Sequence, residues 1–104
     1  MALYEPGAVY LSASGEQLRG RQIRENFRRL AALQPHMSGE MLSAIVTEGI
    51  AFVHNRWDFR GQRPDGTAVR SGGISTVVLR RRGDSGWGIL IDDPWGGSQR
   101  PSRG

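Results

Sequence analysis

The chain has 104 residues, of which 38% are hydrophobic and 8% aromatic, and this composition predicts one folded domain rather than a disordered chain. It contains no cysteine, so disulfide bonds and thiolate metal sites are excluded. All 14 basic residues are arginine and the formal net charge is +4. Arginine without lysine is typical of GC-rich coding sequences, so we attribute the basicity to codon composition and expect no nucleic-acid partner.

Two further features narrow the class of protein. No apolar run approaches the roughly 20 residues that span a bilayer, and residues 1–6 lack a basic segment followed by an apolar one. The two histidines, His36 and His54, lie too far apart in the sequence to suggest a metal centre. We therefore expect a cytoplasmic protein that has no membrane contact, no metal and no cofactor.

The first third of the chain predicts a strand, a short hairpin and a helix. Residues 8–11 are β-prone, residues 12–16 are small and turn-forming, and residues 17–19 follow them. From Gly20 the apolar residues recur at helical spacing while arginines occupy the other faces, which indicates an amphipathic helix ending near Pro35. The apolar residues of this pattern are Ile23, Phe27, Leu30 and Ala31.

The remainder predicts a β-meander. The β-prone segments lie at about 37–47, 50–60, 69–81 and 87–92. Glycine, aspartate or proline occurs in the segments between them, which favours tight turns and antiparallel hairpins.

One helix and these strands predict an α+β fold in which a curved antiparallel sheet packs on one long helix. The domain is expected to span residues 1–95, and residues 96–104, which show no periodicity, are expected to form a flexible tail. The arginine run 80–82 borders a turn and is interpreted as a solvated hairpin end.

Strand residues alternate between faces, so Arg56 and Asp58 are predicted to share a side with His54. The opposite face is apolar, and one helix can cover only one face of the sheet. An exposed apolar face usually marks an interface, so we predict a two-fold homodimer formed through the sheet. The residues predicted at this interface are Val53, Trp57, Val78, Ile89 and Ile91.

Three motifs carry a resemblance to a known family: residues 2–10 (ALYEPGAVY), 18–23 (LRGRQI) and 87–95 (WGILIDDPW). These three motifs, taken in their order along the chain, resemble those of the SnoaL-like, nuclear transport factor 2-like superfamily. The resemblance implies a cone-shaped sheet around a deep pocket for a small apolar molecule, and frequent dimerisation through the sheet. Family members normally begin with one or two helices, whereas here the sequence starts where that segment would end; this implies either a fragment or a more open cone.

The superfamily includes ketosteroid isomerases, polyketide cyclases, limonene epoxide hydrolase, dehydratases and proteins without catalytic activity, so the fold does not select an activity. At the positions of the two carboxylic acids of the ketosteroid isomerases this sequence has Ser12 and Val77. Neither residue can accept a proton as a base or serve as the protonated acid, so isomerisation by that route is excluded.

The pattern of limonene epoxide hydrolase fits better. Arg56, Asp58 and Asp92 resemble its Arg-x-Asp motif and its further aspartate, and Tyr10 resembles the tyrosine that holds the water. The family's asparagine is replaced here by Ser12. The resemblance implies that Asp92 is the base and Asp58 the acid in opening an epoxide, with Arg56 as a bridge between them.

General chemistry supports these roles, because epoxide opening by water needs one carboxylate to take a proton and one acid to give one. An arginine can hold two carboxyl groups by bidentate hydrogen bonds, and a closed pocket separates their pKa values. The alternative is that Arg56 and Asp58 form an ordinary cross-strand ion pair and that Asp92 merely ends a strand.

The remaining residues predicted to contact a ligand are apolar or aromatic, except for Ser12 and His54. His54 shares the face of Arg56, and Trp95 is placed at the pocket mouth. The complete set is Ser12, Phe27, Leu30, His54, Val77, Leu90 and Trp95. Three functions remain open at this point: a cofactor-free epoxide hydrolase, a non-catalytic protein that binds an apolar metabolite, and another SnoaL-like isomerase or cyclase.

Overall fold

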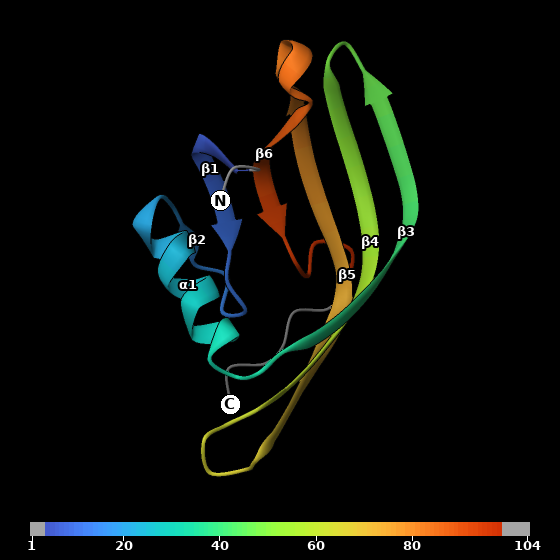
Figure 1. Cartoon of the computed structure of the whole chain (residues 1–104). Coiled ribbons are helices and arrows are strands. Elements are labelled where there is room, and N and C mark those ends of the chain that lie inside the picture. The colour runs from blue at the N-terminus through green and yellow to red at the C-terminus, as the bar shows by residue number, and fades with distance from the viewer. Residues whose placement is uncertain (1–3, 99–104) are drawn as a thin grey trace.

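A computed structural model describes residues 4–98 and shows one helix and a curved six-stranded sheet (Figure 1). In chain order the elements are β1 (Tyr4–Leu11), β2 (Gln17–Leu18), α1 (Arg21–Ala31), β3 (His36–Thr47), β4 (Ile50–Gln62), β5 (Ala68–Arg81), the short 3₁₀ helix η1 (Gly83–Ser85) and β6 (Trp87–Asp93). The predicted α+β class, the single helix and the positions of the strands are confirmed. The helix ends at Ala31, a few residues before the predicted end near Pro35.

The strands lie in the order β2-β1-β6-β5-β4-β3. All neighbours are antiparallel except β1 and β6, which run parallel, so the prediction of a wholly antiparallel sheet is wrong at this one pair. The β1–β6 pair joins the two ends of the described chain, and no hairpin turn in the sequence could have indicated it. Parallel neighbours need a long crossover, which here consists of β2, α1 and the meander β3–β5.

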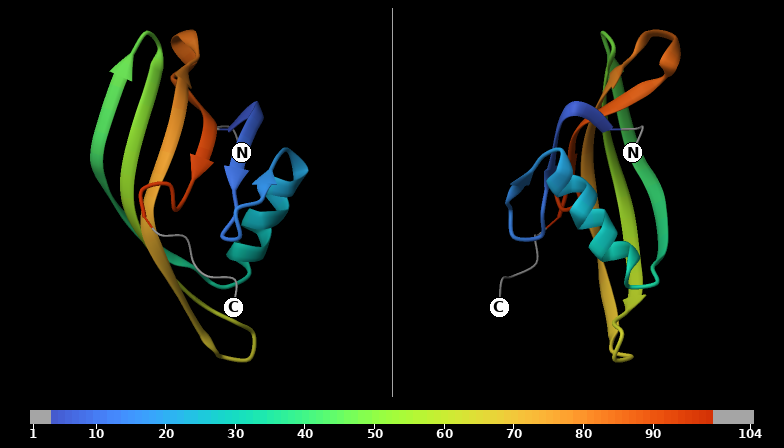
Figure 2. Two further views of the ribbon diagram at one scale, coloured as in Figure 1. Left: turned by 180° about the vertical axis from the view of Figure 1, so that it is seen from behind. Right: turned by 60° about the vertical axis from the view of Figure 1, so that its left-hand side comes forward.

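The long strands β3, β4 and β5 bend along their length, and α1 lies on their concave side (Figures 1 and 2). We call this concave side of the sheet the inner face and the opposite side the outer face. On β4 the two faces follow strict alternation: Ala51, Val53 and Phe59 are buried on the inner face, whereas Phe52 and Arg56 on the outer face are exposed. The apolar core of the domain therefore lies on the inner face of the sheet.

Phe27 of α1 packs on this inner face. Its ring lies 5.9 Å from the ring of Tyr4 and 5.4 Å from the ring of Tyr10, measured between centroids. Ile23, one turn earlier, is the buried residue of the helix. The amphipathic pattern of α1 thus places its apolar side against β1, as burial of an apolar stripe requires.

The segment after β6 is held against β5. The backbone N–H of Gly97 donates to the carbonyl oxygen of Ile74 at 2.8 Å, and the N–H of Ile74 donates to Oγ of Ser98 at 3.0 Å. Gly97 and Ser98, which the sequence assigned to a flexible tail, therefore contact β5, and residues 99–104 of that tail lie outside the described part of the chain. The predicted domain boundary at residue 95 stays a prediction. Among residues 4–98 no helix is long and apolar enough to cross a membrane.

Candidate functional site

A row of directly paired residues crosses the inner face from β1 to β4. Tyr10 pairs with Asp92, Asp92 with Val77, and Val77 with Val53. Directly paired residues point to the same side of a sheet, so Asp92 shares the inner face with these apolar and aromatic neighbours. The structure therefore places one carboxyl group on an otherwise largely apolar surface beneath α1.

Tyr4 completes this arrangement, because its hydroxyl donates a hydrogen bond to Oδ2 of Asp92. Burial raises the pKa of the Asp92 carboxyl above its ordinary value, and the neighbouring Asp93 acts in the same direction. The hydrogen bond from Tyr4 favours the charged carboxylate and opposes this rise. Asp92 is thus a carboxyl group whose pKa is raised mainly by burial, and such shifted pKa values are common in acid–base and ligand-binding groups.

Both tyrosines beside Asp92 remain protonated at neutral pH. Burial, together with the charge of Asp92, raises the pKa of Tyr10 to about 12 and raises the pKa of Tyr4 further. A hydrogen bond from Asn26 of α1 partly offsets the rise for Tyr10. Because the O–H of Tyr4 is donated to Asp92, the neutral phenol of Tyr10 is the one that can donate a hydrogen bond to an oxygen atom of a ligand.

A cleft of about 150 Å³ opens beside Tyr4, between the start of β1 and the start of α1. Its walls are formed by Tyr4, Glu5, Pro6, Gly20, Ile23 and Arg24. Of the Tyr4–Asp92 pair, Tyr4 forms part of the wall of this cleft. The deep apolar pocket predicted from the sequence is not confirmed and remains a prediction.

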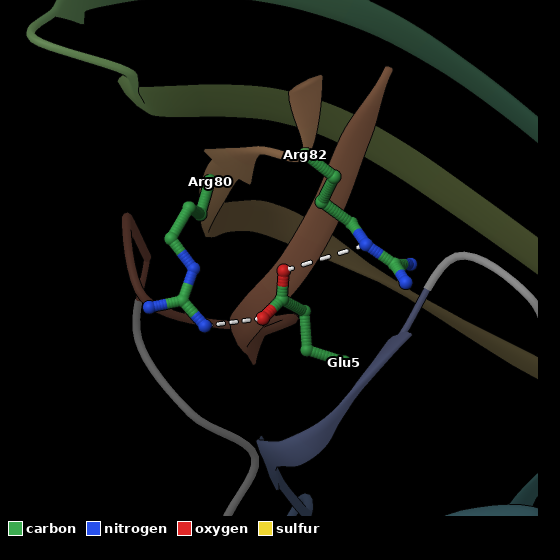
Figure 3. A network of polar contacts seen from close by, with 3 residues as sticks. All are labelled: Glu5, Arg80 and Arg82. Atoms are coloured by element: carbon green, nitrogen blue, oxygen red, sulfur yellow. Dashed lines mark hydrogen bonds and ion pairs between the residues drawn. The ribbon is translucent and has the colours of Figure 1, made fainter. Parts of the chain in front are cut away.

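Glu5, in the wall of this cleft, is held by two arginines of the run 80–82 (Figure 3). Its carboxylate accepts a hydrogen bond from Arg80 and lies 3.8 Å from Nε of Arg82, and its side chain is only 8% exposed. The hydrogen bond from Arg80 lowers the pKa of Glu5. Arg81 lies over the ring of Trp87 at 4.9 Å, so the run is more than the solvated hairpin end that the sequence suggested.

Arg56 and Asp58 do not join Asp92, and here the predicted catalytic arrangement is wrong. Both lie on the outer face, where Arg56 binds Glu40 of β3 at 2.8 Å and Asp58 binds Arg60 at 3.4 Å. The Arg56 side chain is 61% exposed. Because β4 and β5 pair without interruption and Val77 is opposite Asp92, strand alternation puts Asp92 on the other side of the sheet.

The remaining predicted ligand residues are divided between several places. Phe27 and Val77 lie at the Asp92 site, and Leu30 lies one turn further along α1, partly exposed. Trp95 is buried against Trp57, with ring centroids 5.4 Å apart, while Nε1 of Trp57 donates to the carbonyl oxygen of Pro94 at 2.6 Å. Trp95 therefore packs in the core rather than at an open pocket mouth.

The other three residues serve local structure. Oγ of Ser12 accepts a hydrogen bond from the backbone N–H of Glu16 and so stabilises the β1–β2 turn. His54 lies on the outer face beside Phe52. Leu90 stands where the register of β5 and β6 shifts, so the alternation predicted for the last strand is interrupted there.

The predicted dimer surface is not one surface. Val53, 8% exposed, and Trp57 lie on the inner face, whereas Val78 and Ile91 pair with each other on the outer face. The sequence pattern predicted the alternation along β4 correctly but placed the helix on the wrong face of the sheet. The predicted homodimer itself stays a prediction.

Sequence reasoning missed two contributors to the Asp92 site, Tyr4 and Asn26. Tyr4 lies in the motif of residues 2–10 that supported the family resemblance, but its partner is 88 residues away. Asn26 interrupts the apolar stripe of the predicted helix beside Phe27, and this was the available signal for it. Within residues 4–98 no three histidine, aspartate or glutamate side chains gather as metal ligands would.

Comparison with solved structures reveals close similarity in fold at low sequence identity. A conserved protein from Planctomyces limnophilus is 14% identical, with a TM-score of 0.79 over 88% of this chain and 73% of its own. A nuclear transport factor 2-like superfamily protein from Salmonella enterica is 22% identical, with a TM-score of 0.74 over 98% of this chain and 77% of its own.

A ketosteroid isomerase-like protein from Erwinia carotovora atroseptica is 16% identical, with a TM-score of 0.74 over 88% of this chain and 74% of its own. No protein-family model and no curated protein matches the sequence. At these identities the likeness establishes the architecture, and the chemistry has to be argued from the residues themselves.

Proposed function

Because the chain has the nuclear transport factor 2-like fold, we propose that it binds a small, largely apolar molecule on its inner face, and that Asp92 recognises a polar group of that molecule. The observation that carries this proposal is the position of Asp92, a partly buried carboxyl on an apolar face between Tyr4 and Tyr10. Ligand sites are typically apolar surfaces with a few polar groups that fix orientation.

The arrangement favours a ligand that carries a hydroxyl or carbonyl oxygen. The Asp92 carboxylate can accept a hydrogen bond from a hydroxyl, and the Tyr10 hydroxyl can donate to a carbonyl, whereas the single O–H of Tyr4 is donated to Asp92. Phe27 and Val77 offer apolar surface to the rest of the ligand. Tyr4, which donates a hydrogen bond to Asp92, also lines the cleft, and this supports access of a ligand from that side.

The binding experiment compares 2-naphthol with naphthalene, which lacks the hydroxyl, by fluorescence titration. We expect 2-naphthol to bind the wild type about tenfold more tightly, because a hydrogen bond to a charged group contributes about 1.5–3 kcal/mol. This preference should shrink in Asp92→Asn, whose amide oxygen is an uncharged and weaker acceptor, and persist in Asp84→Asn, in which an exposed aspartate of η1 loses the same charge. Absence of saturable binding to the folded wild type would contradict the proposal.

A catalytic role is a second candidate, supported by the raised pKa of Asp92 next to the hydroxyl donor Tyr4. A base of this kind can take a proton from carbon next to a carbonyl while a phenol stabilises the oxygen. Two structural neighbours are described as ketosteroid isomerase-like and as a putative ketosteroid isomerase. Epoxide opening through an Arg56 bridge is not part of this proposal, since Arg56 and Asp58 lie on the outer face.

The catalytic candidate is tested by NMR, from the exchange of α-protons of cyclic ketones in D₂O. Faster exchange with the wild type than with Asp92→Asn would support proton abstraction. Equal exchange with both proteins, together with the binding preference above, would leave a binding protein without catalysis.

A further inference from the structure

Strand β3 (His36–Thr47) is an edge strand of the sheet, and all twelve of its residues are exposed. Within the part of the chain that the structure describes, seven large apolar side chains are exposed, and five of them lie on this strand. Their exposed fractions run from 40% to 65%. These residues are Met37, Met41, Leu42, Ile45 and Val46.

The edge of β3 has little of the protection that free edges usually carry. Soluble proteins protect edge strands with lysine, proline or inward-pointing charges. β3 contains neither lysine nor proline, and its one carboxylate, Glu40, is paired with Arg56 on the outer face. What β3 does have is one bulge at Leu42, where Met41 pairs with Asn55 and Ser43 pairs with His54.

The bulge determines how β3 can pair with itself. Before it, Met37 and Gly39 are on the inner face, and after it Ala44 and Val46 are on that face, because the extra residue reverses the alternation. In an antiparallel pair, opposite residues must share a face. The inner-face residues have odd numbers before the bulge and even numbers after it. A register that spans the bulge therefore satisfies this condition only if odd-numbered residues of one strand lie opposite even-numbered residues of the other.

The register with the largest overlap meets this condition. With His36 opposite Thr47 of a second copy, all twelve residues are paired, and Met37 lies opposite Val46 on the inner face. On the outer face Ser38 lies opposite Ile45, and Glu40 lies opposite Ser43 rather than opposite another Glu40. The strand is therefore self-complementary in length, in face and in charge.

From these observations we propose that two copies of the chain join edge to edge through β3, in antiparallel register about a two-fold axis at the bulge. The six-stranded sheets then form one continuous sheet of both copies, and the free backbone groups of both edges are satisfied. The apolar side chains of β3 are partly covered by their cross-strand neighbours. This interface is separate from the ligand site at Asp92 and does not depend on the proposed function.

The test uses two charge variants, measured by sedimentation equilibrium. Met37→Glu/Val46→Glu places like charges opposite each other in both symmetry-related pairs, and its dimer dissociation constant should rise at least about tenfold. Met37→Glu/Val46→Lys carries the same first change but forms opposite-charge pairs, so it should stay dimeric. Circular dichroism confirms that both variants fold.

Because the chain has no cysteine, disulfide trapping tests the register directly. Met37→Cys/Val46→Cys should give a covalent dimer on oxidation, whereas Met37→Cys/Ile45→Cys, whose second position lies on the other face, should not. A monomeric wild type at micromolar concentration would overturn the proposal. So would a dimer that both charge variants leave intact and that Phe52→Lys or Ile91→Lys dissociates, since that result would assign the contact to the outer face.

Discussion

The hydroxyl of Tyr4 donates its hydrogen bond to the carboxylate of Asp92 across 88 residues of sequence. This contact ties the first described residue of β1 to the last strand and is made on the inner face beneath Phe27. Tyr4→Phe should lower the free energy of unfolding by about 1–3 kcal/mol, because it removes a hydrogen bond to a charged group. Urea unfolding of the variant and the wild type measures this difference.

The same variant should raise the pKa of Asp92, since the hydrogen bond from Tyr4 opposes the effect of burial. NMR titration of the labelled Asp92 carboxyl reports this pKa. Tyr10→Phe is the matched control, because it removes a neighbouring hydroxyl and keeps the Tyr4 hydrogen bond. An Asp92 pKa that does not change in Tyr4→Phe would show that this contact is not made in solution.

Asp92→Asn should change the pH dependence of stability in a defined direction. The pKa of Asp92 is higher in the folded state than in the unfolded chain, so the folded state holds the proton more tightly. The free energy of unfolding should therefore fall as pH rises from the ordinary range of aspartate through the raised pKa, and should level off above it. The asparagine variant should lack this fall, which urea unfolding across acidic and neutral pH will show.

Glu5→Gln should act in the opposite direction. The pKa of Glu5 is lowered by Arg80, so its stabilising effect is complete above the ordinary glutamate range of about pH 4 and is lost as pH falls through the lowered pKa. The variant should be less stable than the wild type at neutral pH and equal to it in strong acid. Glu25→Gln, a change on the exposed side of α1, should show no such difference.

Gly73→Ala should disturb the packing of Trp95. A Cβ atom at residue 73 would lie 2.8 Å from Oγ of Ser98 and 3.0 Å from Cδ1 of Trp95, so the segment after β6 would have to move. We expect a loss of about 1–3 kcal/mol of stability and a weaker near-ultraviolet circular dichroism signal. Gly39→Ala, where the nearest atom is the carbonyl oxygen of Arg56 at 3.5 Å, is the control and should have a smaller effect.

Arg56→Ala should change the free energy of unfolding by less than about 1 kcal/mol. Its ion pair with Glu40 is exposed on both sides, and exposed ion pairs contribute little. A loss of several kcal/mol in urea unfolding would instead indicate the buried Arg56 network that the sequence suggested, and would contradict the placement of Arg56 on the outer face.

Local sequence patterns were enough to predict the class of fold and its helix and strands. The apolar spacing at Ile23 and Phe27 predicted α1, and β-branched runs ended by glycine and aspartate predicted β3 to β6, because these signals depend on neighbours close in the chain. The alternation along β4 was also predicted correctly. It separated Val53 and Trp57 from Arg56 and Asp58.

The side of that alternation that faces the helix became clear from the packing of the folded chain. Strand alternation defines two faces but does not say which one another element will cover, so Arg56 and Asp58 were assigned to the site and Val53 and Trp57 to the surface. The parallel pairing of β1 with β6, which brings Tyr4 and Tyr10 to Asp92, likewise has no local signal. Such contacts depend on packing between segments distant in sequence, whereas helices, strands and turns are specified by residues a few positions apart.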